Sequence, residues 1–186
     1  STLIRIMLDL IRNTDSQEIS INGKDNKSLE ARQLLSYLPE KFDIKKEVSG
    51  SQYLKFVANI YRQAYDQDRI AQLCEQLSFD ISRLADKTFT YSKGMKQKLG
   101  LISCFMLDLP LIILDEPLTG LDPTARYRFK QLLLDERKHD RSIFYSTHLL
   151  ADAEEICDQF GILHQGRIVF DGTPRQCLQQ FQQDTL

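Results

Sequence analysis

The chain has 186 residues, of which 42% are hydrophobic, and its formal net charge at pH 7 is −2. This length accommodates one domain with a substantial core. The near balance of charge, without a basic block, argues against a nucleic-acid-binding surface. Four cysteines lie far apart without a C-x-x-C pair, which favours reduced, mostly buried thiols in a cytosolic protein over a disulfide framework or a zinc site. The longest apolar stretch is interrupted by Asp108 and Pro110 and is too short to span a bilayer.

The first part of the chain predicts several short elements. Residues 1–12 carry apolar residues at helical spacing. Residues 18–21 alternate like a half-exposed strand, which stops at the turn dipeptide Asn22-Gly23. The next expected elements are a short helix over residues 28–32, a strand over 34–38 and a loop over 39–43.

From residue 49 to about residue 84 the pattern is helical, without any strand signal. Ser49 and Gln52 have the spacing of a capping box, in which each side chain satisfies the other residue's backbone N–H. The first helix carries an apolar stripe: Tyr53, Phe56, Val57, Ile60, Tyr61 and Ala64. A second helix is expected over residues 68–77, with Ile70, Leu73, Cys74 and Leu77 on one face. We interpret this region as a helical lobe inserted into an α/β core.

Residues 91–98 open the next predicted helix. Ser92 is a good N-cap, and the apolar face contains Met95, Leu99, Ile102 and Met106. On composition alone, an ordinary capped surface helix explains this pattern. The alternative is an anion site, because free N–H groups at a helix start, a hydroxyl, the close approach that Gly94 allows and nearby lysines all suit a phosphate.

The four apolar residues 111–114 are typical of a strand that is buried on both faces of a parallel sheet. Asp115 and Glu116 end this strand, and Pro117 prevents the ladder from continuing. Ligands bind at the carboxyl ends of the strands in open α/β sheets. Asp115 is therefore placed to hold a metal ion, and Glu116 to point at a nearby water. An ordinary acidic turn after a strand is the alternative.

Asp122 and Pro123 are expected to cap and start the following helix. Residues 142–146 predict another buried strand, and His148 follows its end. A lone histidine is more often structural than catalytic, but a position beyond the carboxyl end of a core strand favours a functional role. A hairpin over residues 160–170 and a final amphipathic helix complete the chain.

Three separated motifs, in this order, resemble those of the ATP-binding cassette (ABC) ATPases. They are Ser92-Lys93-Gly94-Met95-Lys96-Gln97, then Ile113-Leu114-Asp115-Glu116-Pro117 with Thr119-Gly120-Leu121-Asp122-Pro123, then Ser146-Thr147-His148. The resemblance runs from Ser1 to about Asp171 and implies an α/β fold, a P-loop NTPase-like core with a mainly parallel sheet and an inserted α-helical sub-lobe. We expect a single domain over residues 1–186, with the core over 1–45 and 89–186 and the sub-lobe over about 46–88.

The resemblance assigns three residues to the chemistry of ATP hydrolysis. Asp115 matches the carboxylate that helps to hold Mg²⁺ at the end of the central strand. Glu116 matches the general base that polarises the attacking water, and His148 matches the switch histidine that contacts the γ-phosphate. These roles suit phosphoryl transfer, in which catalysis is mainly positioning and charge neutralisation.

Other residues match positions at which two subunits of the family meet head to tail. Ser92 and Gly94 match the signature motif, which binds the γ-phosphate held by the opposite subunit. Asp122 matches the aspartate that crosses the dimer interface. Lys93 stands where the commonest family form has a second glycine, and its charge could act toward a phosphate. A second nucleotide-binding domain is thus an implied partner.

Two features near the start depart from the family pattern. Glu40 stands where most members have glutamine, in the loop that couples the nucleotide state to the transmembrane partner, and a glutamate can still ligate Mg²⁺ or a water. No G-x-x-x-x-G-K-[ST] sequence occurs in the 186 residues. Ser1 and Thr2 resemble the nucleotide-binding pair that follows the lysine of that loop, with Ser1 as a Mg²⁺ ligand, so we expect the loop just before residue 1. A helix that simply begins with Ser-Thr is the alternative.

The resemblance therefore implies the ATP-binding and hydrolysing subunit of a transporter that uses ATP and Mg²⁺, and Lys93 and Glu40 resemble the variants of the export type. It also implies a transmembrane permease, docked near residues 40–48, and a location at the inner face of the cell membrane through that permease. Without the loop, the 186 residues should turn over ATP negligibly. Two alternatives stay open: a soluble ABC protein of translation or repair, and a truncated cassette that acts as an interaction module, which has no chemical need for Glu116 and His148.

Overall fold

The computed structural model describes residues 1–12, 18–44, 47–138 and 141–183, with the backbone alone over 181–183. The chain forms two compact units, Ser1–Ser146 and Thr147–Leu186. The predicted helical lobe belongs to the first unit, and residues 45 and 46, where that lobe is expected to begin, lie outside the described residues. The division of the core from the lobe, and the single domain over residues 1–186, stay predictions.

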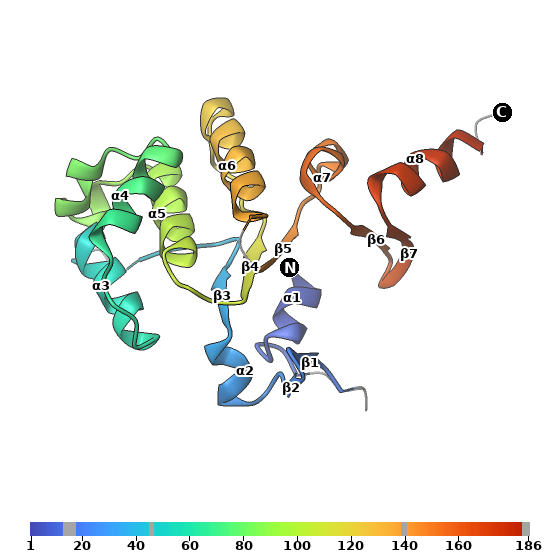
Figure 1. Cartoon of the computed structure of the whole chain (residues 1–186), viewed down its shortest axis with the longest axis horizontal. Coiled ribbons are helices and arrows are strands. Elements are labelled where there is room, and N and C mark those ends of the chain that lie inside the picture. The colour runs from blue at the N-terminus through green and yellow to red at the C-terminus, as the bar shows by residue number, and fades with distance from the viewer. Residues whose placement is uncertain (13–17, 45–46, 139–140, 184–186) are drawn as a thin grey trace. The chain divides into compact units, whose positions relative to one another are not determined.

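A three-stranded parallel sheet lies at the centre of the first unit (Figure 1). Its strands, in spatial order, are β3 (Leu35–Leu38), β4 (Leu111–Asp115) and β5 (Ser142–Ser146). Leu38 pairs with Leu114, and Asp115 pairs with Ser146. The carboxyl ends of the three strands therefore lie at one edge of the sheet. The three apolar residues that precede Asp115 in β4 are 0% exposed, which confirms the prediction of a buried central strand.

The burial of β5 differs from the prediction. Its residues alternate between exposed and half-buried, and Phe144 is 40% exposed. Within the part of the chain that the structure describes, β5 pairs with β4 alone and is an outer strand of its sheet. An apolar run predicts burial only where other elements cover it. The prediction of a buried strand over residues 142–146 is therefore wrong, although the strand itself is present.

The amino-terminal elements pack below β3 and β4. They are α1 (Thr2–Met7), β1 (Ser20–Ile21), β2 (Lys24–Asp25) and α2 (Leu29–Gln33). The helix α1 stops before the predicted end at residue 12, because Asp9 adopts a φ of 55°, a left-handed conformation that cannot continue an α-helix. One buried cluster joins these elements to the sheet: Ile4, Leu8, Ile21, Ala31, Leu35 and Ile113.

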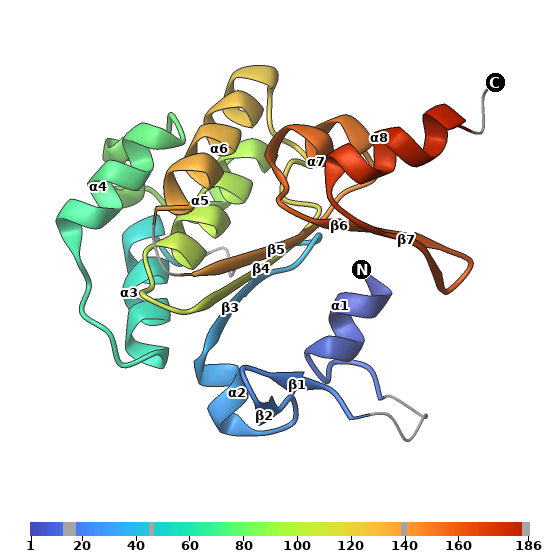
Figure 2. The ribbon, with the colours of Figure 1, turned by 45° about the vertical axis from the view of Figure 1, so that its right-hand side comes forward.

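The predicted helical lobe is confirmed as a run of helices without strands, in which α3 and α4 lie beside α5 in both views (Figures 1 and 2). The elements are α3 (Gly50–Ile60), α4 (Gln67–Gln76), the 3₁₀ turns η1 (Ile81–Ala85) and η2 (Thr88–Thr90), and α5 (Lys93–Phe105). The capping box forms as predicted: Ser49 Oγ accepts a hydrogen bond from Gln52 N, and Gln52 Oε1 accepts one from Ser49 N.

The face that α3 buries was predicted only in part, and Tyr53, Val57 and Tyr61 of the predicted stripe are half-buried. Leu54 and Ala58 are buried, whereas Phe56 and Ile60 of the predicted stripe are 61% and 59% exposed. The helix carries apolar residues over a wide arc, so its sequence does not decide which part of that arc meets the core. In α4 the predicted face is correct, and Ile70, Leu73, Cys74 and Leu77 are all buried.

The cysteine prediction is confirmed for three of the four positions. Cys74, Cys104 and Cys177 are buried, and Cys157 is half-buried. Burial raises the pKa of the Cys74 thiol to about 11 and that of Cys104 to about 12. These two thiols therefore stay protonated at neutral pH and serve as core residues rather than as nucleophiles.

The first unit continues with α6 (Pro123–Glu136), and the second unit contains α7 (Leu150–Ile156), β6 (Phe160–His164), β7 (Arg167–Gly172) and α8 (Pro174–Gln183). Asp122 caps α6 as predicted. The strands β6 and β7 form the predicted antiparallel hairpin, in which the rings of Phe160 and Phe170 lie 5.3 Å apart between centroids. Among the described residues, no helix combines the length and the hydropathy that crossing a bilayer requires.

A buried carboxylate connects α4, α6 and the start of β5. Glu136 is 2% exposed, and Arg69 Nη2 donates to its Oε1 at 2.6 Å. Arg141 Nε lies 3.2 Å from its Oε2, as an ion pair. The two guanidinium groups also donate to the carbonyl oxygens of Phe105 and Leu107. This cluster fixes the helical lobe against the core through charge as well as apolar packing.

Replacing Glu136 with glutamine should lower the free energy of unfolding by about 2–3 kcal/mol. The two half-buried guanidinium groups lose the charge of Glu136, and the loss is smaller than for a fully buried pair because Arg69 is partly exposed. Urea unfolding followed by circular dichroism measures the difference. Glu75→Gln, an exposed position on α4, should change stability by less than about 0.5 kcal/mol. Equal stability of the two variants would contradict this account.

Candidate functional site

The residues predicted as metal ligands come together at the carboxyl ends of β3 and β4. Ser1 Oγ donates a hydrogen bond to Glu40 Oε2 at 3.0 Å, and the Ser1 nitrogen lies 3.5 Å from Asp115 Oδ1. Asp115 is 2% exposed, whereas Ser1, Glu40 and Thr2, the first residue of α1, are exposed. Ser1 thus contacts both carboxylates, Glu40 through its hydroxyl and Asp115 through its backbone nitrogen.

The electrostatic effect of these carboxylates is seen at Tyr37 on β3. Burial raises the pKa of the Tyr37 hydroxyl, and the negative charges of Asp115 and Glu40 raise it as well, against a lowering effect of Arg5. The same negative field favours a bound cation. Oxygen ligands with few protein donors match Mg²⁺, which completes its six-coordinate shell with water and phosphate oxygens.

The described residues contain no group of three or more His, Cys, Asp and Glu side chains that could hold a metal ion. Two carboxylates and one hydroxyl are oxygen donors, which Mg²⁺ prefers when phosphate and water oxygens supply its other ligands. The donor set at the end of β4 fits the ion that the sequence implies.

Glu116 follows Asp115 directly and has an unusual backbone conformation. Its φ is 51°, in the left-handed region that few residues other than glycine adopt. Its backbone N–H donates to Ser146 Oγ at 3.0 Å, and the Ser146 hydroxyl in turn donates to Asp115 Oδ1 at 2.7 Å. The side chain of Glu116 is half-buried. Such strained residues gather at functional sites, where the surrounding contacts maintain them.

The start of α5 lies against the loop that follows β4. Ser92 caps α5 as predicted, with its Oγ accepting from Met95 N at 3.2 Å. A Cβ at Gly94 would lie 3.1 Å from the carbonyl oxygen of Gly120, and a Cβ at Gly120 would lie 3.2–3.3 Å from the side-chain carbons of Lys93. Two predicted phosphate-binding residues, Lys93 and Gly94, are therefore in contact with the turn that precedes Asp122.

Asp122 and His148 complete the predicted residues. Asp122 is exposed, and its Oδ1 accepts from Ala125 N at 2.9 Å as the N-cap of α6. His148 is an exposed residue of the second unit and follows Ser146, the last residue of β5, by two positions. Its role at the site stays a prediction.

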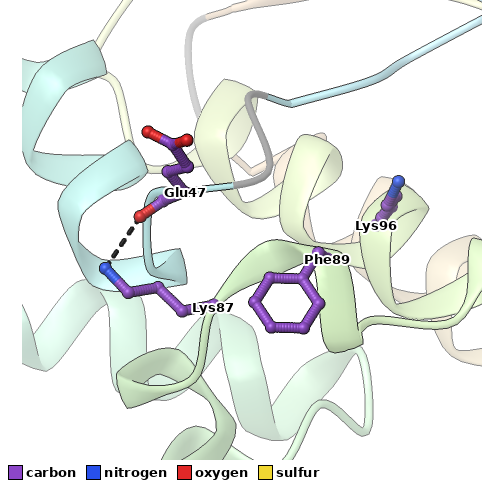
Figure 3. A pocket seen from close by; sticks show the side chains of 4 residues that line it. All are labelled: Glu47, Lys87, Phe89 and Lys96. Carbon is purple, nitrogen blue, oxygen red and sulfur yellow. Dashed lines mark hydrogen bonds between the residues drawn. The ribbon is translucent and has the colours of Figure 1, made fainter.

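A cavity of about 740 Å³ lies at the predicted docking loop, within the first unit. Figure 3 shows its lining side chains, Glu47, Lys87, Phe89 and Lys96, with Lys87 Nζ donating to the carbonyl oxygen of Glu47 at 2.7 Å. The Phe89 ring is 62% exposed. The cavity thus presents one aromatic ring and charged groups of both signs to the solvent.

The neighbouring loop residues Phe42 and Asp43 are engaged in contacts within the chain. The Phe42 ring lies 5.7 Å from the Tyr53 ring of α3, edge to face, and it packs against Gly100 of α5. Asp43 Oδ1 accepts a hydrogen bond from Lys96 Nζ at 2.8 Å. These contacts attach the loop that carries Glu40 to both α3 and α5.

Comparison with known proteins identifies the family. The family model described as ABC transporter matches residues 1–119. The ABC-type transporter ATP-binding protein EcsA of Bacillus subtilis is 32% identical over 97% of this chain and 74% of that protein. The chain belongs to the ABC transporter family. An uncharacterized ABC transporter ATP-binding protein of Synechocystis is 31% identical over 96% of this chain, and the chain spans about half of its length (51%).

The fold agrees with that of a solved ABC protein. The structure of an ATP-binding subunit of an ABC transporter superimposes with a TM-score of 0.85, at 32% sequence identity, over 97% of this chain and 76% of that chain. This match confirms the predicted P-loop NTPase fold of the α/β class. The fold of the chain is accordingly that of an ABC ATP-binding subunit, and the roles of its single residues are proposals.

Sequence reasoning missed two polar contacts in this ABC site. Ser146 was recognised only as the first residue of the Ser-Thr-His motif, and Gln97 only as the end of the signature motif. Gln97 is buried, and its Nε2 donates to the carbonyl oxygen of Pro117 at 2.9 Å. Gln97 lies on the side of α5 opposite the predicted apolar face, so the sequence does not signal its burial, although a buried amide needs such a hydrogen-bond partner. Nothing in the sequence indicates the partner of Ser146.

The contact between Lys93 and the turn predicts a difference between two glycine substitutions. Gly23 and Gly120 both have a positive φ, of 73° and 82°, but a Cβ at Gly23 would meet nothing within 4 Å. Gly23→Ala should therefore lower the free energy of unfolding by the backbone cost alone, about 1 kcal/mol, and Gly120→Ala by about 2 kcal/mol. In a Lys93→Gly background, Gly120→Ala should lower the free energy of unfolding no more than Gly23→Ala does. An excess that persists without Lys93 would contradict the contact.

Proposed function

We propose that this chain is the catalytic part of an ATP-hydrolysing subunit of an ABC transporter, in which residues at the end of β4 act on Mg²⁺-bound ATP. The observation that carries this proposal is the meeting of Ser1, Glu40 and Asp115 immediately beside Glu116. A metal-binding oxygen cluster next to a carboxylate that can act as a base suits hydrolysis of the terminal phosphoanhydride bond of ATP.

In the proposed reaction, Ser1, Glu40 and Asp115 would hold the magnesium ion that accompanies ATP. When bound, this ion neutralises charge on the β- and γ-phosphates. The carboxylate of Glu116 accepts a proton from a water whose oxygen bonds to the γ-phosphorus, while the bond to the ADP oxygen breaks. The half-buried position of Glu116 supports this role, since solvent water can reach its carboxylate.

The proposed complete site contains two protomers, head to tail. Ser92, Lys93 and Gly94 of one protomer would contact the γ-phosphate bound by the other, and Thr2 and His148 would contact the nucleotide within one chain. The N-terminal position of Ser92 and Gly94 on the 13-residue helix α5 supports the first assignment, because the N–H groups there attract anions. Asp122 would reach across the same interface.

The proposed partner is a transmembrane permease, which would hold the subunit at the inner face of the membrane. The cavity beside the Glu40 loop supports this docking site, because it combines an exposed aromatic ring with charged groups, as hot spots of protein interfaces do. Lys93 and Glu40, as family variants, support an exporter. Ion pairing of Asp43 with Lys96 connects the cavity rim to the Glu40 loop.

The 186 residues contain no G-x-x-x-x-G-K-[ST] sequence, and that loop cradles the phosphates of ATP in this class of enzyme. We therefore infer that these residues alone hydrolyse ATP at a negligible rate. Hydrolysis is therefore proposed for a subunit that also contains such a phosphate loop, called the complete subunit below.

Glu116→Gln should reduce ATP hydrolysis by the complete subunit at least about a hundredfold, because an amide cannot accept the proton of the attacking water. Phosphate release measures the rate, and binding of a fluorescent ATP analogue should change by less than about threefold. Glu154→Gln, an exposed position on α7, is the matched control and should retain the wild-type rate. Measurable hydrolysis by the purified 186 residues, abolished by Glu116→Gln, would refute the need for the loop.

Two equally exposed phenylalanines test the docking site. Phe89 lines the cavity and is 62% exposed, whereas Phe56 lies on α3 and is 61% exposed. Phe89→Asp should reduce co-purification with the co-expressed permease by at least about tenfold, since it places a charge in the proposed interface. Phe56→Asp should have little effect, and both variants should unfold at the wild-type urea concentration. Equal retention of the permease by both would rule out this site. Phe42 is unsuitable because its ring packs inside the chain.

A further inference from the structure

Ser146, the last residue of β5, lies beside the two acidic residues that end β4. The parallel register places it directly opposite Asp115. Its hydroxyl takes part in two hydrogen bonds, as acceptor from Glu116 N at 3.0 Å and as donor to Asp115 Oδ1 at 2.7 Å. One oxygen atom thus connects the backbone of the proposed base to the carboxylate of the proposed metal ligand.

The first bond acts on a strained backbone. Glu116 has a φ of 51°, a left-handed conformation that is unfavourable for a residue with a Cβ. A left-handed residue persists only where its surroundings hold it, and the bond from Glu116 N to Ser146 Oγ is such a restraint. The direction in which the Glu116 carboxylate leaves the backbone depends on this conformation.

The second bond acts on the side chain of Asp115. This carboxylate is 2% exposed, so water is a poor substitute for a missing partner. Donation from the Ser146 hydroxyl occupies one lone pair of Oδ1 and fixes the rotation of the carboxylate about its Cβ–Cγ bond. The other lone pairs of the Asp115 carboxylate then keep a fixed direction, in which they can face a cation or a water bound to it.

We propose that Ser146 is a positioning residue for this site, one that sets the orientation of Asp115 and of Glu116 at the same time through a single hydroxyl. The inference rests on the proposed function for its effect on hydrolysis. The role needs a group that accepts one hydrogen bond and donates another, which threonine supplies and alanine does not. Ser146→Ala leaves the Glu116 N–H and Asp115 Oδ1 without these bonds, whereas Ser146→Thr keeps both.

The first measurement is independent of ATP hydrolysis. In the 186-residue chain, amide hydrogen exchange at Glu116 should be about tenfold faster in Ser146→Ala than in the wild type, as expected for loss of one hydrogen bond. Ser146→Thr should exchange within about threefold of the wild type. Ser142→Ala, at the exposed opposite end of the same strand, is the matched control and should leave this rate unchanged.

The second measurement uses the complete subunit with Mg²⁺ and ATP. Ser146→Ala should lower kcat by about tenfold or more and leave KM for ATP within about threefold, because misorientation acts on the transition state rather than on binding. Ser146→Thr should restore most of kcat, and Ser142→Ala should match the wild type. If Ser146→Ala does not fold, Ser146→Cys, with its weaker donor and acceptor, takes its place and should give intermediate values.

The outcomes separate the two proposals. The positioning role would be overturned if Ser146→Ala kept the wild-type exchange rate at Glu116 and the wild-type kcat. It would also be overturned if Ser146→Thr did not restore these two values. A fall of kcat without faster exchange at Glu116 would also overturn it, because the effect would then not pass through this bond. If the wild-type subunit shows no hydrolysis that depends on Glu116, the proposed function fails instead, and the exchange rates alone decide whether Ser146 holds the turn.

Discussion

The parallel register of β3, β4 and β5 is the constraint on which the site depends. It brings the carboxyl ends of three strands to one edge, so that a hydroxyl at the end of β5 lies opposite Asp115 and the loop with Glu40 starts beside them. A shift of one residue would turn Asp115 toward the other face of the sheet. The apolar residues of β4, buried on both faces, maintain the register, and in this way the packing of the core sets the geometry of the polar site.

Further side-chain contacts attach other segments of the chain to this edge of the sheet. The Phe42 ring packs between α3 and α5 and holds the loop with Glu40, and Gln97 donates from α5 to the carbonyl oxygen of Pro117, immediately after Glu116. The signature helix and the acidic turn are thus parts of one hydrogen-bonded assembly. In a two-protomer site, movement of α5 toward a neighbouring nucleotide would reach the turn after Glu116 through this amide.

The sequence predicted those features that local chemistry decides. The caps Ser49, Ser92 and Asp122 formed as expected because each needs only a side-chain oxygen and the first turn of its own helix. Features that depend on which other elements pack against a segment were not predictable in this way. They include the buried face of α3 and the exposure of β5. Family motifs, rather than periodicity, predicted the cluster of Ser1, Glu40 and Asp115. The bonds of Ser146 required the strand register, which one sequence does not reveal.

Two carboxylates of this chain are each 2% exposed, and their surroundings explain why one is structural and the other is a candidate ligand. Glu136 pairs with the guanidinium groups of Arg69 and Arg141, so its charge is already neutralised and it stabilises the fold. Asp115 instead accepts a bond from a neutral hydroxyl and acts together with Glu40 to raise the pKa of Tyr37. A hydroxyl orients a carboxylate without cancelling its charge. The Ser1 nitrogen, 3.5 Å from Asp115 Oδ1, offsets part of the negative charge of Asp115 and Glu40, and a divalent cation that brings its own phosphate oxygens would neutralise more of it.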